Sequence, residues 1–231
     1  MQKIFFTLAI LILAIHAHSQ TNKWYTTSAG EIVFSFASVD NNGNESGNIM
    51  RFSPVFNFQN LLNYDVYEYV GIFTGLNLRN IGFIYDEPNT NIRKKYRSYN
   101  IGVPIGIKFG NMSGGFLYGG YEIEFPINYK EKTFENEKKT DKFNVWFSNR
   151  QPAYYHTVQV GIQFKGGTNL KFKYYLTGFF NKKFKETINS AEIKPFENFD
   201  VNVFYVSLNY NLFKNSKFNN PVKANKVSEV Y

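Results

Sequence analysis

Charged side chains recur within segments whose other positions alternate between apolar and small polar residues. Glu122 and Glu124 lie two positions apart, so an extended strand places both carboxylates on one face. Two adjacent carboxylates suit acid–base chemistry when one of them stays protonated. Lys and Arg side chains on the same face of neighbouring strands favour the other outcome, in which both stay ionised. We therefore expect a structural charge network whose members are Glu31, Arg51, Arg79, Lys108, Glu122, Glu124, Lys171 and Lys173.

His156 is the one histidine beyond residue 19, and Ser148 and Asp141 lie in the segment before it. These residue types build hydrolytic triads, but a triad depends on a geometry that proximity in sequence does not provide. The alternation of its strand places His156 on the apolar face. We expect a structural histidine and no catalytic residues.

Metal and nucleotide sites lack their usual residue patterns. The chain has no cysteine, and its scattered carboxylates do not form a set of metal ligands. The glycines of GVPIGIKFG and YGGYE are not followed by a helical segment, so they do not match a nucleotide-binding loop. We predict no metal and no cofactor.

The segments that carry these residues follow an export signal. Lys3 precedes the apolar run Ile4–Ile15, and Ala17 and Ser19 are the small residues of a cleavage site. The run is shorter than the roughly 20 residues of a transmembrane helix. We predict a signal peptide over residues 1–19, a barrel over 20–213 and a periplasmic tail over 214–231.

Eight segments alternate with the period of a two-faced strand. They are Glu31–Val39, Ile49–Gln59, Tyr69–Ile81, Tyr96–Phe109, Gly115–Tyr129, Tyr154–Lys165, Asn169–Thr177 and Val201–Phe213. Outer-membrane barrels combine short periplasmic turns with long outer loops. The links alternate in the same way, short at Asn60–Val66, Gly110–Gly114 and Gly166–Thr168, and longer at Asp40–Asn48, Tyr85–Lys95, Lys130–Ala153 and Asn181–Asp200.

The polar face decides between a membrane barrel and a soluble calyx, which would show the same alternation. A water-facing exterior is crowded with Lys, Glu, Asp and Thr, whereas this face is rich in Gly, Ser, Asn and Gln with a few charges of both signs. Such residues fit the narrow lumen of an eight-stranded barrel, where buried charges must be paired. We predict an all-β fold, a closed antiparallel up-and-down transmembrane barrel of eight strands.

With its signal peptide, strand count, loop asymmetry and a last strand VFYVSLNYNLF that ends in Phe213, the chain resembles the small bacterial outer-membrane β-barrels. These include the OmpA/OmpX type and the PorT-like outer membrane β-barrel proteins, and the resemblance covers Glu31–Phe213. It implies the barrel fold and a place in the outer membrane of a Gram-negative bacterium. Members of this family differ in role, so the resemblance does not supply a function.

Basic residues account for the net charge of +8 and gather at the loop ends. Export argues against nucleic acid as the partner, whereas the phosphates of lipopolysaccharide lie beside the outer loops. Solvated loops would carry the same charges without any ligand, and both interpretations stay open. Lysine binds phosphate through charge-assisted hydrogen bonds, which makes candidate contacts of Lys94, Lys95, Lys182, Lys183 and Lys185.

The link at 130–153 also contains an apolar cluster, Phe143, Val145, Trp146 and Phe147. If exposed, it would mark the contact site of a protein partner. If folded back, it would join the upper aromatic girdle of the barrel, which is the arrangement we favour.

We expect a non-enzymatic integral barrel with a packed polar lumen, basic outer loops and a structural or interaction role among outer-membrane lipids and lipopolysaccharide. One alternative is a lipid A deacylase-like hydrolase that uses His156. The other is a small porin, which is disfavoured because eight strands leave no aqueous channel.

Overall fold

The structure, a computed structural model, describes residues 24–41, 43–46, 49–188 and 190–214, so the predicted signal peptide and nearly all of the predicted tail lie outside it. In these ranges no helix is long and apolar enough to cross a bilayer. Eight antiparallel strands form a ring. Their bounds are β1 (Trp24–Asn41), β4 (Phe58–Tyr67), β5 (Val70–Asp86), β6 (Ile92–Gly110), β7 (Phe116–Glu135), β9 (Tyr155–Gln163), β10 (Thr168–Tyr175) and β13 (Phe199–Lys214).

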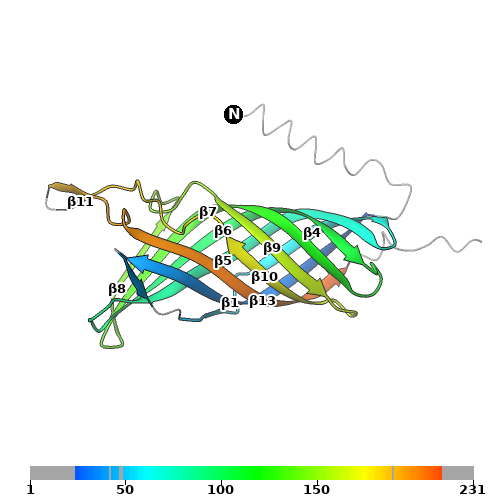
Figure 1. Ribbon diagram of the computed structural model, residues 1–231, viewed down its shortest axis with the longest axis horizontal. Coiled ribbons are helices and arrows are strands. Elements are labelled where there is room, and N and C mark those ends of the chain that lie inside the picture. The colour runs from blue at the N-terminus through cyan, green and yellow to red at the C-terminus, as the bar shows by residue number, and fades with distance from the viewer. Residues whose placement is uncertain (1–23, 42, 47–48, 189, 215–231) are drawn as a thin grey trace, which may run out of the picture.

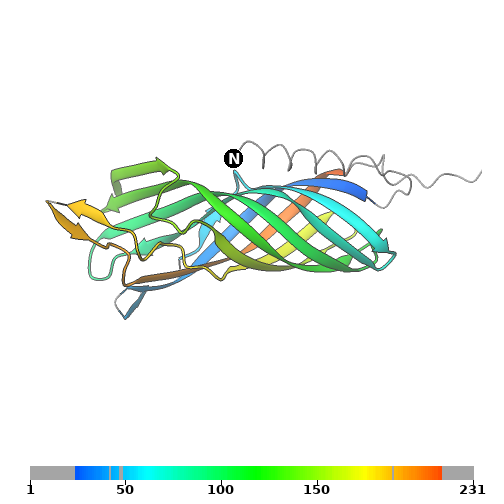
Figure 2. The same ribbon diagram turned by 90° about the horizontal axis from the view of Figure 1, so that it is seen from above.

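The first and last strands close the ring. β13 pairs with β1 along a register that runs from Thr27↔Lys214 to Asn41↔Phe199, and the other six strands each pair with two neighbours. Figures 1 and 2 show the strands wound obliquely about one long axis. Each membrane-spanning strand therefore has both edges paired, as hydrocarbon requires. The prediction of a closed, eight-stranded antiparallel barrel is confirmed.

The apolar face points outward. Ile105, Leu76 and Leu208 are 63%, 62% and 45% exposed, whereas Glu122 and Lys173 are fully buried on the inner face. An exterior of this kind is stabilised by hydrocarbon, and a soluble calyx would have the two faces exchanged. The chain is an integral barrel of the outer-membrane type, and its place is the outer membrane of a Gram-negative bacterium.

Short turns and long hairpins lie at opposite ends of the barrel. At one end, β9 and β10 are joined by residues 164–167, where Gly166 and Gly167 have φ values of 100° and 93° that L side chains rarely adopt. At the other end, strands continue into β8 (Lys138–Trp146), β11 (Glu186–Ile188) and β12 (Ala191–Ile193), seen at the left of Figure 1. The end with the long hairpins is the outer end by the rule for such barrels.

The second membrane strand is displaced from its predicted position. We placed it at Ile49–Gln59 with a link at Asn60–Val66, but β4 begins at Phe58 and that link is strand. The residues before it form β3 (Arg51–Ser53), which pairs with β1. The chain then breaks because Pro54 has no N–H for the ladder and Phe56 has a φ of 61°.

Two predicted outer loops are largely strand. β5 and β6 extend through most of Tyr85–Lys95, and β8 pairs with the end of β7 inside Lys130–Ala153. A short β2 (Asn44–Ser46) likewise pairs with the outer end of β1. Beyond the membrane both faces of a hairpin meet water, so the apolar–polar alternation on which the prediction rested is lost there.

Candidate functional site

Inward-facing side chains form three layers along the barrel axis. On β5, Tyr85 and Phe83 lie toward the outer end, Arg79 lies in the middle, and Asn77 and Phe73 lie toward the periplasmic end. β10 repeats this order, with Tyr175 at the outer end, Lys173 and Lys171 in the middle, and Asn169 at the periplasmic end. From the outer end of the barrel to its periplasmic end, the three layers are therefore aromatic, ionic and rich in amide side chains.

Six of the eight predicted network residues meet in the ionic layer. Each is at most 2% exposed, and three carboxylates balance three cations. The ion pairs are Arg79–Glu31, Arg79–Glu122 at 3.6 Å, Lys171–Glu31 at 2.6 Å, Lys173–Glu122 at 2.8 Å and Lys173–Glu124.

Hydrogen bonds add to the solvation of two of these carboxylates, Glu124 and Glu31. Glu124 accepts from Asn100 Nδ2 at 2.7 Å and from the Tyr175 hydroxyl at 2.8 and 2.9 Å. Ser207 Oγ donates to Glu31. Paired and hydrogen-bonded carboxylates stay ionised, so the layer has the properties of a structural network and not of a proton-transferring pair.

The other two predicted members lie outside this layer. Arg51 donates to Asn80, to its side-chain oxygen at 2.6 Å and its carbonyl at 3.2 Å. Lys108 lies near the periplasmic end, 2.7 Å from Asp65 and 2.9 Å from the Tyr25 hydroxyl. Asp65 and Asn80 were not among the predicted residues. The sequence pattern predicts a turn at Asp65, although Asp65 continues the inward phase of Asn63 on the same strand.

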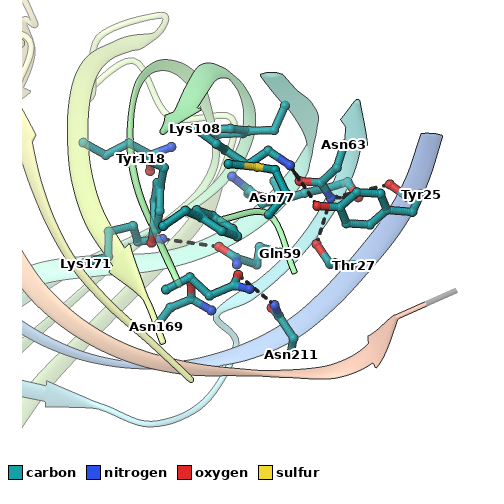
Figure 3. A pocket seen from close by; sticks show the side chains of 16 residues that line it. Tyr25, Thr27, Gln59, Asn63, Asn77, Lys108, Tyr118, Asn169, Lys171 and Asn211 are labelled. Atoms are coloured by element: carbon teal, nitrogen blue, oxygen red, sulfur yellow. Dashed lines mark hydrogen bonds between the residues drawn. The ribbon is translucent and has the colours of Figure 1, made fainter. Parts of the chain in front are cut away.

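A polar cavity of about 50 Å³ occupies the periplasmic third of the lumen (Figure 3). Lys171 Nζ donates to Gln59 at 3.4 Å, and Asn211 Nδ2 donates to Gln163 at 3.1 Å across it. The cavity has room for a few water molecules but is far smaller than the several hundred Å³ of a typical ligand site. Its carboxamide lining consists of Gln59, Asn63, Asn77, Gln159, Gln163, Asn169 and Asn211.

Aromatic side chains close the outer mouth of the barrel. Phe179, Phe180 and Phe196 come from the connector between β10 and β13 and fold into the lumen. Phe180 stacks on Phe196 with ring centroids 4.2 Å apart, and Phe179 meets Phe83 edge-on at 5.1 Å. The Tyr155 hydroxyl donates to the Phe179 carbonyl at 2.8 Å and fixes the connector. Sequence reasoning missed this plug, and the Phe179-Phe180 pair beside a predicted loop was the signal for it.

His156 points outward, as its alternation predicted. Its Nδ1 is hydrogen-bonded to the Tyr121 hydroxyl, and the Tyr154 ring lies edge-on at 5.0 Å. Ser148 Oγ accepts from a backbone amide, and Asp141 lies in the β8 ladder. These residues therefore show no triad geometry. Within the described part of the chain, no group of three or more His, Asp and Glu residues could hold a metal ion.

The predicted lipopolysaccharide contacts at the outer end fall into two groups, and one of these lies on the β10–β13 connector. Lys182 pairs with Asp200 at 2.5 Å and Lys185 with Glu192 at 2.7 Å. Lys183 is exposed beside them. Two of these three lysines are thus already neutralised by the protein itself.

The second group lies on β6, where Lys94 and Lys95 project to opposite faces. Lys94 is paired with Tyr85 of the inner face, whereas Lys95 points outward with its Nζ 4.7 Å above the Phe134 ring. The structure therefore does not bring all five predicted lysines to one place.

The apolar cluster of the 130–153 segment divides between the two faces of β8. Phe143 and Val145 pack against the buried hydrophobic cluster at the outer mouth, where Phe143 meets the Tyr129 ring, and Arg150 lies 4.3 Å above the Phe143 ring. Trp146 and Phe147 stay exposed at the outer rim. Half of the cluster therefore belongs to the core, and half stands at the level of an interfacial girdle.

No protein-family model matches the chain, and no curated protein does. Solved structures of outer-membrane proteins do match. Ail of Yersinia pestis in complex with the heparin analogue sucrose octasulfate is 14% identical, with a TM-score of 0.37, over 80% of this chain and 97% of that one. Neisserial surface protein A is 11% identical, with a TM-score of 0.37, over 82% and 97%. OprG from Pseudomonas aeruginosa is 10% identical, with a TM-score of 0.34, over 84% and 99%.

Proposed function

We propose that the chain is a non-enzymatic structural or interaction barrel that acts through its outer surface and is held there by lipopolysaccharide. The filling of the lumen supports this most directly. Six paired charges are covered on the outer side by the packed rings of Phe83, Phe179, Phe180 and Phe196. Because side chains fill the interior, the outer rim and the lipid-facing surface are the parts of the barrel that can contact other molecules.

The lumen separates this proposal from a small porin. A periplasmic cavity of about 50 Å³ ends below the ionic layer, and eight strands enclose an interior just wide enough for side chains. We expect folded protein to give no steady conductance in planar bilayers, with a trimeric porin as positive control. The variant Phe180→Ala/Phe196→Ala should be equally silent because the ionic layer still fills the lumen. Reproducible single-channel openings of the unaltered protein would refute a sealed barrel.

A further inference from the structure

The outward face of the β6–β7–β8 sheet carries a cluster of cations above the membrane belt. Arg97 is paired with Lys130, and Lys95 is paired with Lys132, which is paired in turn with Lys142. Directly paired residues lie on one face with Cβ atoms about 5 Å apart. The face is outward because the neighbouring Tyr96 and Tyr129 are buried in the lumen. We call Lys95, Arg97, Lys130, Lys132 and Lys142 the cationic ladder.

The carboxylate that lies beside the ladder on its own face, Asp86, already pairs with Arg93. Among the described residues, Arg97, Lys130, Lys132 and Lys142 form no ion pair, while the adjacent Arg93 is taken by Asp86 at 2.6 Å. Partial burial and the charges of Arg97, Lys130, Lys139 and Lys142 together lower the pKa of Lys132, which lies above the belt. Like charges directly opposite each other in a sheet are destabilising, so this arrangement favours an external anion.

The height of the ladder identifies the kind of anion. Tyr99, Asn128 and Trp146 form the next outward row toward the membrane, about 7 Å away for two residues of strand. Trp146 is exposed there, with Phe125 and Tyr154 nearby on the belt. Exposed aromatic residues at this position mark the membrane interface. The ladder therefore stands in the headgroup layer of the outer leaflet.

We propose that the cationic ladder binds the phosphorylated sugar headgroup of outer-leaflet lipopolysaccharide. This inference rests on the proposed function, because it requires the barrel to stand in that leaflet. It assigns the contact to the β6–β7–β8 face and retains Lys95 alone of the five lysines predicted from sequence. Lys182 and Lys185 lie on the β10–β13 connector, outside the ladder, and each has a carboxylate partner of its own.

The test compares variants of the full chain, refolded in detergent, for binding of purified lipopolysaccharide. Lys130→Gln/Lys132→Gln removes two central cations of the ladder, and Lys130→Arg/Lys132→Arg keeps their charge. Lys182→Gln/Lys185→Gln is the matched control on the other side of the rim. Enzymatically dephosphorylated lipopolysaccharide and competition by inorganic pyrophosphate distinguish a lipid-bound phosphate from a free one. The heat-dependent shift in gel mobility reports that each variant has folded.

We expect the Gln pair to bind roughly tenfold more weakly or worse, since it loses two charge-assisted contacts. The Arg pair and the Lys182/Lys185 control should bind as the unaltered protein does, and dephosphorylation should cause the same loss as the Gln pair. The inference would be overturned if the folded Lys130→Gln/Lys132→Gln variant bound lipopolysaccharide as tightly as the unaltered protein does. It would also be overturned if pyrophosphate alone displaced all of the bound lipopolysaccharide. Channel activity would instead overturn the proposed function, so the two failures are distinguishable.

Discussion

At the scale of single residues, the barrel is specified by charges that are buried together. Lys173 contacts both Glu122 and Glu124, and all three are fully buried. A buried ion pair contributes little net stability, but removal of one partner leaves a charge that nothing compensates. The layer therefore fixes how the strands face one another more than it adds to the free energy of unfolding.

Lys173→Met should lower the free energy of unfolding by roughly 3–5 kcal/mol, because two carboxylates then share fewer cations. The double variant Glu124→Gln/Lys173→Met restores the charge balance and should lose clearly less than the sum of the two single variants. Guanidinium titration of protein reconstituted in phospholipid vesicles measures these values. Additive losses would show that the two side chains are not energetically coupled.

All eight predicted charged residues are buried, but only six of them meet in one layer. Alternation gives the direction of a side chain, and the eight are indeed buried. It does not give height along the barrel axis, which depends on the strand register. Lys108 therefore meets Asp65 near the periplasmic end, and Arg51 meets Asn80, instead of joining the central layer.

At the scale of elements, one glycine marks a point where the backbones of neighbouring strands come very close together. Gly82 on β5 has a φ of 154°, and a Cβ atom there would lie 2.0 Å from the carbonyl oxygen of Tyr96 on β6. Its own carbonyl accepts a hydrogen bond of 2.8 Å from Ser35 on β1. Three strands thus depend on the absence of a side chain at one position.

Gly82→Ala should destabilise the barrel by about 1–3 kcal/mol, the range for a strained backbone conformation. Gly30→Ala is the matched control, since a Cβ at Gly30 meets nothing within 4 Å. Urea-dependent unfolding followed by tryptophan fluorescence compares the two variants. An equal effect of both substitutions would mean that β5 and β6 adjust without strain.

Sequence reasoning misplaced two kinds of element. In one, the apolar alternation continues across a break in the strand, and in the other it ends before the strand does. Met50, Phe52 and Phe58 keep the outward phase across Pro54, so Ile49–Gln59 looked like one strand. In the β7–β8 hairpin, polar residues occupy both faces, so the strand looked like loop. Register and pairing there depend on backbone hydrogen bonds, which the apolar pattern does not record.

At the scale of the whole molecule, the barrel has an apolar exterior that lipid stabilises and an interior that holds paired charges. The outward side chains of β6 show this along one strand: Ile101, Val103, Ile105, Ile107 and Phe109 are all exposed. Ile105 is the middle residue of this row, and Phe109 lies at its periplasmic end.

Depth in the bilayer should therefore decide the cost of a charge on this row. Ile105→Lys should reduce the free energy of unfolding in vesicles by about 2–4 kcal/mol, and Phe109→Lys by about 0–1 kcal/mol, because an ammonium near the interface reaches water. Guanidinium titrations of both variants in the same phospholipid vesicles give the comparison. If the row faced water, lysine would be tolerated equally at Ile105 and at Phe109, since both side chains are already exposed. Equal and negligible losses would therefore show that the row does not lie in hydrocarbon.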